Sequence, residues 1–74
     1  MGDHIHLRDV VLSSIGSVLI DTAFVFDNKC YETLVVKCNY KGDPDWSSDL
    51  DCKLHSSEED AIKGHNKMKD KWEV

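Results

Sequence analysis

The chain has 74 residues, of which 41% are hydrophobic and 31% charged, and it carries a formal net charge of −5. This length gives one domain, residues 1–74, and the composition excludes an intrinsically disordered protein. The acidic balance argues against direct nucleic-acid binding, because a phosphate backbone attracts basic surfaces. No apolar run reaches the roughly 18–20 residues of a membrane span, and the first residues lack a secretory signal, so we expect a cytoplasmic protein that does not bind membranes.

The N-terminal segment, residues 1–16, is ambiguous. Its stretch LRDVVLSSIG is compatible with a helical turn, an extra edge strand or a mobile arm. We favour an extended segment that leads into the first regular strand.

Two strands joined by a short turn are predicted next. Residues 17–26, SVLIDTAFVF, are rich in β-branched and aromatic side chains and alternate between two sides. Asp27 and Asn28 favour a turn at this point, because both residue types tolerate the left-handed backbone conformation. The pattern CYETLVVKCNY then predicts a second strand over 30–40.

A loop and a third strand follow. Gly42 and Pro44 interrupt regular structure, so residues 41–48 are predicted to form a loop. Residues 49–55, DLDCKLH, alternate between apolar and charged positions, which predicts a strand with one solvent-exposed face. The apolar side comprises Leu50, Cys52 and Leu54, and the charged side comprises Asp49, Asp51 and Lys53.

The last predicted element is an amphipathic helix over 57–72. Ser56 and Ser57 both suit the N-cap, and Ser56 has the capping-box spacing with Glu59. Acidic residues occupy the first turn and lysines the last turns, which is the arrangement that the helix dipole favours. The stripe that should face the sheet consists of Ala61, His65, Met68 and Trp72.

Together these elements predict a small α+β domain. An antiparallel sheet of three strands, or four with the N-terminal segment, should pack against one C-terminal helix. A sheet this small leaves exposed edges and an incompletely covered face. We therefore expect a homodimer or a larger closed oligomer, with Trp72, Tyr31 or the first strand near the contact.

The second strand and the helix carry a family resemblance. CYETLVVKC, followed by DLDCKLHSSEEDAIKGHNKM, resembles a widespread set of small bacteriophage proteins. Their pattern combines an aromatic-Glu-Thr strand with a Ser/Thr-x-Glu-Glu-x-Ala-hydrophobic-x-Gly-His helix, and the match spans roughly residues 18–72. The chain departs from it in its three cysteines and in a first strand without the usual aspartate-histidine ending. The resemblance implies a phage or prophage origin, without a chemistry to carry over, and directs attention to Glu32, Thr33, Gly64 and His65.

The Gly64-His65 pair has three interpretations. In the structural one, the His65 ring packs under the sheet and is held by a backbone carbonyl, Glu32 or Thr33, while Gly64 allows a close approach of the helix. In the second, both residues face another subunit. In the third, His65 is catalytic or binds a metal, although a lone histidine is a weak signal of nucleophilic chemistry.

The three cysteines are interpreted as reduced, small, buried hydrophobic residues. Cys38, Cys52 and His65 form the best alternative metal set, since the first two could be cross-strand neighbours below the helix. His55 has zinc-compatible spacing to Cys52, but strand alternation places it on the opposite side. We expect neither a bound metal nor any other cofactor.

An acidic loop that contains a tryptophan is the most distinctive surface feature. A tryptophan among aspartates either folds back on the sheet or anchors a partner. The predicted partner-binding residues are Trp46, Asp43, Asp45, Asp49 and Asp51.

No phosphate-binding glycine loop, nucleophile elbow or pair of catalytic carboxylates is recognisable. We therefore favour a non-enzymatic phage accessory protein that binds and modulates a host protein with a basic surface, such as a defence or nucleic-acid-processing factor, in the host cytoplasm. The alternative is an oligomeric protein that sequesters a nucleotide-like small molecule. Its available basic donors are Arg8, Lys37 and Lys41.

Overall fold

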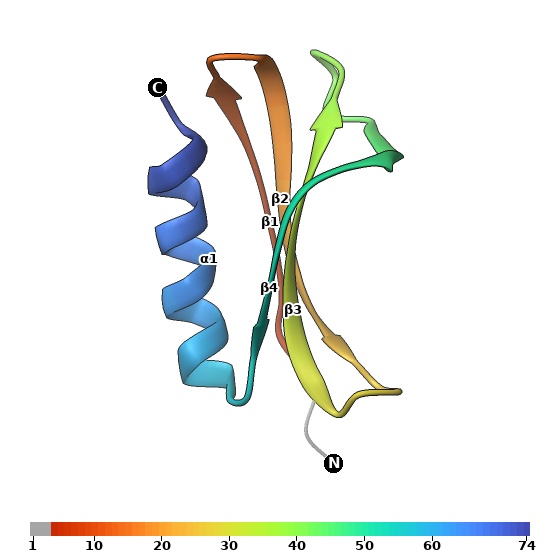
Figure 1. Cartoon of the computed structure of the whole chain (residues 1–74), viewed down its shortest axis with the longest axis vertical. Helices are drawn as coiled ribbons and strands as arrows, with labels where there is room; N and C mark the ends of the chain where they lie inside the picture. Colours follow the sequence, from red (N-terminus) through yellow and green to blue (C-terminus); the bar gives the residue numbers. More distant parts are fainter. Residues whose placement is uncertain (1–3) are drawn as a thin grey trace.

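A computed structural model describes residues 4–74 as one antiparallel sheet with a C-terminal helix on one face (Figure 1). The strands lie in the order β1-β2-β3-β4, and each pairs with its neighbour in sequence. The elements are β1 (His6–Ser13), β2 (Gly16–Val25), β3 (Cys30–Cys38), β4 (Pro44–His55) and α1 (Glu58–Trp72). The predicted α+β fold is confirmed.

The ambiguous N-terminal segment provides the fourth strand. β1 pairs with β2 along its whole length, from His6 opposite Ala23 to Ser13 opposite Gly16. Residues 1–3 of that segment lie outside the described part. β2 is consequently a central strand of the four-stranded sheet.

The prediction of a loop over 41–48 is wrong in its second half. β4 begins at Pro44, which pairs with Cys38, and the ladder contains register shifts on either side of Val36. Proline is tolerated there because β4 is an edge strand. Residues 45–48, between the paired Pro44 and Asp49, form a bulge in β4. Asp45 stabilises this bulge, because its carboxylate accepts hydrogen bonds from the backbone N–H and the hydroxyl of Ser47.

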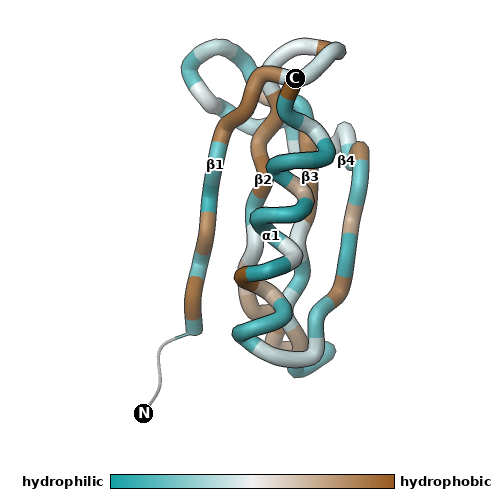
Figure 2. Tube along the Cα trace, turned by 90° about the vertical axis from the view of Figure 1, so that its left-hand side faces the viewer, coloured by the Kyte–Doolittle hydropathy of each residue, from teal (hydrophilic) through white to brown (hydrophobic). Residues whose placement is uncertain are grey.

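The hydrophobic core lies between the sheet and α1. It is built from Val11, Val18, Ile20, Val35 and Met68, against which Leu50 and Trp72 pack. Ser57 is the N-cap of α1, and its side chain accepts a hydrogen bond from the backbone N–H of Asp60. Of the two serines that suited this position in the sequence, Ser57 therefore has the capping role. In Figure 2, α1 lies over β2 and β3, between the two edge strands, and its outer side is mainly hydrophilic.

The predicted faces of the third strand are wrong for β4. Asp51 pairs with Val35 and Lys53 with Thr33, so the charged residues are on the helix side of the sheet. Cys52 and Leu54 lie on the other side and are exposed. The bulge next to Val36 explains the position of Leu50, because an extra residue reverses the alternation and places Leu50 in the core.

The sheet face opposite α1 is referred to below as the open face. Leu19 and Val36 are buried on it although no helix covers them, with exposed fractions of 3% and 0%. The first half of β4 bends across this face (Figure 1). Among residues 4–74, no helix is long and apolar enough to cross a membrane.

Candidate functional site

A chain of hydrogen bonds runs beneath α1 and joins two histidines through two threonines. Thr22 Oγ1 lies 2.6 Å from Thr33 Oγ1 and 2.7 Å from His65 Nδ1. Thr33 Oγ1 also lies 2.9 Å from His55 Nε2. Both threonines are fully buried, and the two histidines are nearly so. Among the described residues, no buried side-chain nitrogen or oxygen lacks a partner, so this interior polar group is fully satisfied.

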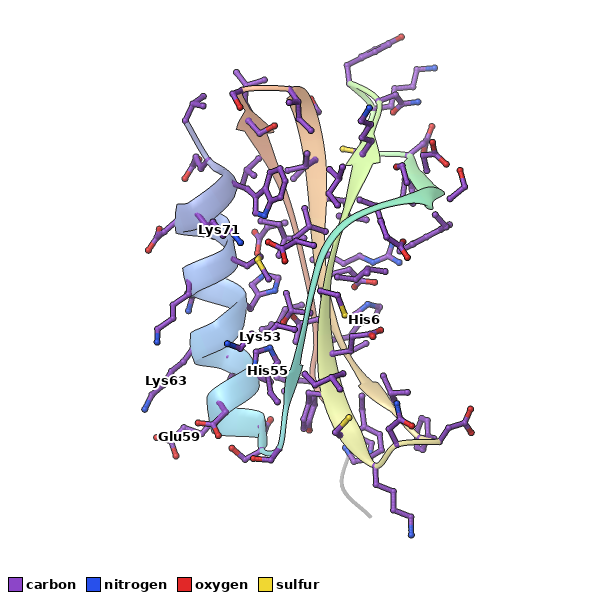
Figure 3. All side chains as sticks on the ribbon, viewed as in Figure 1. His6, Lys53, His55, Glu59, Lys63 and Lys71 are labelled. Carbon is purple, nitrogen blue, oxygen red and sulfur yellow. The ribbon has the colours of Figure 1, made fainter. Side chains whose placement is uncertain are left out.

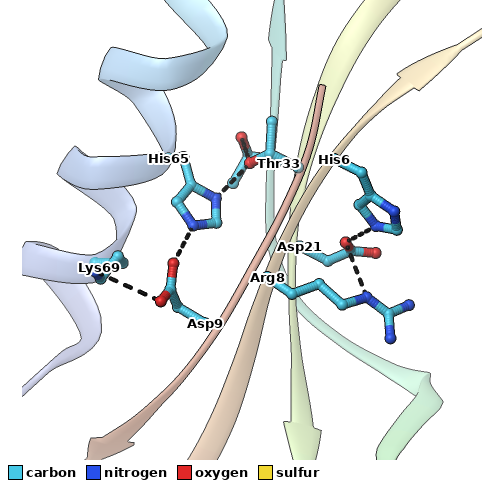
Figure 4. A network of polar contacts seen from close by, with 8 residues as sticks. His6, Arg8, Asp9, Asp21, Thr33, His65 and Lys69 are labelled. Carbon is cyan, nitrogen blue, oxygen red and sulfur yellow. Dashed lines mark hydrogen bonds and ion pairs between the residues drawn. The ribbon is translucent and has the colours of Figure 1, made fainter. Parts of the chain in front are cut away.

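The chain of hydrogen bonds continues to the surface on the β1 side. His65 Nε2 lies 2.7 Å from Asp9 Oδ2, and Lys69 Nζ lies 3.7 Å from the other oxygen of Asp9 (Figure 4). The sequence interpretation expected Glu32 or Thr33 to hold His65. Instead, Thr22 and Asp9 hold it, and Thr33 holds His55. Glu32 is on the open face, where it accepts a hydrogen bond from Cys52 Sγ.

The direction of these hydrogen bonds follows from Asp9, because a carboxylate only accepts. His65 Nε2 therefore carries a proton, and with His65 neutral its Nδ1 accepts from Thr22. Thr22 then accepts from Thr33, which accepts from His55 Nε2.

Gly64 lies on the face of the His55 imidazole. A Cβ at position 64 would lie 2.7 Å from Nε2 and 2.8 Å from Nδ1 of His55, distances that real Cβ atoms do not show. A glycine in a helix interior costs about 1 kcal/mol relative to alanine. Here it lets α1 approach β4 closely enough to enclose His55, which gives Gly64 a packing role within the chain.

The open face carries a separate polar arrangement around Asp21. His6 Nε2 lies 2.6 Å and Arg8 Nε 3.3 Å from Asp21 Oδ1 (Figure 4). The Arg8 guanidinium also lies 5.6 Å from the centre of the Trp46 ring, within reach of a cation–π contact. Trp46 thus lies over the open face with the Arg8 guanidinium near its ring, yet 49% of its surface is exposed to solvent.

The predicted acidic set is divided between the two sides of the sheet. Asp43 accepts from the Asn39 amide in the loop before β4, and Asp45 lies in the bulge beside Trp46. Hydrogen bonds from Ser47 lower the pKa of Asp45, so this carboxylate is charged at neutral pH. Asp49 pairs with Val36. We call Trp46, Arg8, Asp43, Asp45 and Asp49 the Trp46 surface.

Asp51 does not belong to the Trp46 surface. Its Oδ2 accepts from Lys71 Nζ at 2.7 Å and from Trp72 Nε1 at 3.1 Å, on the helix side. The hydrogen bond from Lys71 lowers the pKa of Asp51. Trp72 thereby packs within its own protomer, and Tyr31 is 7% exposed.

The structure does not bring the alternative metal set together. Cys52 is on the open face, whereas His65 is buried on the helix side. Cys38 pairs with Pro44 at the far end of β3. Among residues 4–74, no three histidine, cysteine or acidic side chains are arranged to hold a metal ion.

The basic donors expected for a nucleotide site do not converge. Arg8 is on the open face, and Lys37 pairs with Val18, whose side chain belongs to the core on the helix side. Lys41 lies in the loop before β4, 5.8 Å from the centre of the Tyr40 ring. These three residues do not form one site.

Comparison of the chain with protein-family models, with curated proteins and with solved structures finds no match.

Proposed function

We propose that the chain is a non-enzymatic bacteriophage accessory protein that binds and modulates a host protein through the Trp46 surface. The observation that carries the proposal is the placement of Trp46, which is half exposed and has the Arg8 guanidinium 5.6 Å from the centre of its ring. A large aromatic side chain in a fixed position loses little conformational entropy on binding, and tryptophan is enriched among the residues that dominate interface energies.

The charge around Trp46 supports a basic partner. Asp43 and Asp45 precede the tryptophan in the sequence and Asp49 follows it, and the whole chain has a net charge of −5. An acidic surface with a central aromatic anchor complements a host surface that normally receives nucleic acid, and it accelerates association with such a surface. The buried threonine–histidine chain supports a non-enzymatic role, because both hydroxyls are inaccessible to a substrate.

The proposal includes self-association to a homodimer or larger oligomer. The edge strands of the sheet are β1 and β4, and the Leu12 carbonyl of β1 accepts a hydrogen bond from the backbone N–H of Val74. β1 exposes Val10 and Leu12, and Ile15 follows in the turn, with exposed fractions of 50%, 63% and 53%. Apolar residues along an edge strand favour pairing with a second copy. Light scattering at micromolar concentration should show a dimer or larger species, and a monomer would contradict this part of the proposal.

The binding function is tested by affinity capture from host lysate with the wild-type protein, Trp46→Ala, and a variant in which Asp43, Asp45 and Asp49 are replaced by asparagine. Both changes should abolish capture of the same host protein, which mass spectrometry identifies. Phe26→Ala and Asp27→Asn are matched controls at the opposite end of the sheet and should retain it. Capture that survives both changes at the Trp46 surface would refute the proposal.

A further inference from the structure

A second surface lies between β4 and α1, away from the Trp46 surface. A groove of about 490 Å³ separates the edge strand from the helix, and four of its lining residues are lysines. Lys53 extends from β4, while Lys63, Lys67 and Lys71 follow one another at four-residue intervals along α1. Figure 3 shows Lys53 and His55 between β4 and the helix.

The groove is basic in a chain that is acidic overall. Only two carboxylates, Asp51 and Asp60, line it beside the four lysines. Asp51 is engaged by Lys71 at 2.7 Å, and Lys63 has a partner outside the lining, Glu59, at 3.3 Å. Lys53 and Lys67 form no ion pair with any described residue. A cleft lined mainly by one sign of charge focuses the electrostatic field and raises the local concentration of oppositely charged molecules.

The floor of the groove is polar and fixed. His55 lines it and is 7% exposed, with Nε2 bonded to Thr33. Its other nitrogen, Nδ1, has no partner among the described residues and is not enclosed, so it is available to a bound molecule. Gly64 holds the ring in place from the helix side. Met68 adds a less polar part to the lining.

We infer that this groove binds a small organic phosphate of nucleotide size. Its volume falls in the range of small-molecule sites, about 300–1,000 Å³. Lysine ammonium groups are phosphate ligands, and Lys53 and Lys67 can donate to a phosphate without losing an intramolecular ion pair. The less polar part of the lining is suited to the organic portion, and His55 supplies a fixed hydrogen-bonding group at the floor. This site is independent of the Trp46 surface and of the host protein proposed above.

The site is tested with the full chain by isothermal titration calorimetry at low salt, with ATP, inorganic phosphate and adenosine as probes. ATP should bind, and inorganic phosphate should bind more weakly at the same groove. Adenosine should not bind, because it lacks the charged group. Lys53→Gln and Lys67→Gln should each weaken ATP binding by about tenfold, the scale of one lost charge-assisted hydrogen bond.

Lys41→Gln is the matched control, because it removes the same charge from the loop before β4, outside the groove lining. It should leave ATP affinity unchanged, as should Trp46→Ala. Circular dichroism should show that all variants retain the wild-type fold. The inference is overturned if ATP and phosphate do not bind, or if Lys53→Gln and Lys67→Gln bind ATP as the wild type does.

Discussion

Gly64 and His55 are in direct contact across the helix–sheet boundary, 9 positions apart in sequence, and their fit determines how closely α1 approaches β4. The imidazole occupies the space in which any other residue at 64 would place its Cβ. The adjacent residue, His65, turns to the opposite side and bonds Thr22 and Asp9. The Gly-His pair therefore connects α1 to two different parts of the sheet, with one residue providing space and the other providing hydrogen bonds.

Gly64→Ala should destabilise the protein, although alanine is the better helix former by about 1 kcal/mol. The new methyl group would overlap the His55 ring, and displacement of that ring would break its bond to Thr33. We expect a net loss of about 1–3 kcal/mol in the free energy of unfolding, measured by urea denaturation. Asn66→Ala, at an exposed helix position, is the control and should be neutral or stabilising.

The same substitution in a His55→Ala background separates this contact from a general effect on the helix. Without the ring, Gly64→Ala should no longer destabilise, because the overlap is gone and only the gain in helix propensity remains. An equal loss in both backgrounds would show that the contact with His55 is not the cause.

Thr22→Val should cost about 1–3 kcal/mol despite the nearly equal volume of the two side chains. Valine removes the hydroxyl group that joins Thr33 to His65, which leaves His65 Nδ1 buried without a partner. Thr22→Ser keeps the hydroxyl and should retain the network, losing only the contribution of a methyl group. Urea denaturation of both variants distinguishes the roles, and a smaller loss for valine than for serine would contradict the importance of the hydrogen bond.

The architecture was predictable where the signals are local. The alternation of 17–26, the turn and the next strand identify the central hairpin, and the Ser57 cap with its acidic first turn identifies α1. The faces of β4 were not predictable in this way. The register shift next to Val36 reverses the alternation, and the shift depends on pairing with β3.

The histidine network was only partly predictable, for a similar reason. The spacing of His65 with Ala61 and Met68 indicated its burial, but its partners are 43 and 56 positions away in sequence. Thr22, in a strand of large apolar residues, was the available signal of a buried hydroxyl. Asp9 gave no such signal, because the pairing of its segment with β2 was unresolved. Prediction of the lysine groove from the sequence would have required knowing that Asp51 and Lys53 of β4 face α1.

Acidification should destabilise the fold through His55. Burial, and then the nearby charge of Lys53, lower the pKa of His55 below its ordinary value of 6.5. The neutral form is thus favoured in the folded state, and the unfolded chain binds the proton more readily. Stability from this group is complete above the unfolded pKa and decreases as the pH falls from there through the folded pKa.

The charged groups near His55 are Lys53 on its own strand and Asp60 on α1, and Tyr31 pairs with it from β3. The Asp60 carboxylate acts to raise the pKa of His55, but burial and Lys53 lower it by more. The free energy of unfolding, measured by urea denaturation between about pH 7.5 and about pH 5, should decrease less in His55→Gln than in the wild type. Identical pH profiles would show that His55 does not titrate on unfolding.

Cys52 should be unreactive although it is exposed. Burial of its sulfur, the hydrogen bond to Glu32 and nearby carboxylates raise the pKa of the Cys52 thiol from 9.0 to about 11. Only a small fraction is thiolate at pH 8, and the thiolate is the nucleophile. The low reactivity of Cys52 therefore follows from the raised pKa of its thiol rather than from steric protection.

The measurement uses a Cys30→Ser/Cys38→Ser variant, in which Cys52 is the remaining thiol. Its alkylation by iodoacetamide at pH 8 should be about tenfold or more slower in the folded state than in urea, where the thiol has its ordinary pKa. Glu32→Gln should accelerate the folded-state reaction, because it removes the carboxylate that accepts from Sγ at 3.3 Å. Asp27→Asn, a charge change in the turn before β3, should not. Equal rates in the folded and unfolded states would contradict the raised pKa and the position of Cys52 beside Glu32 on the open face.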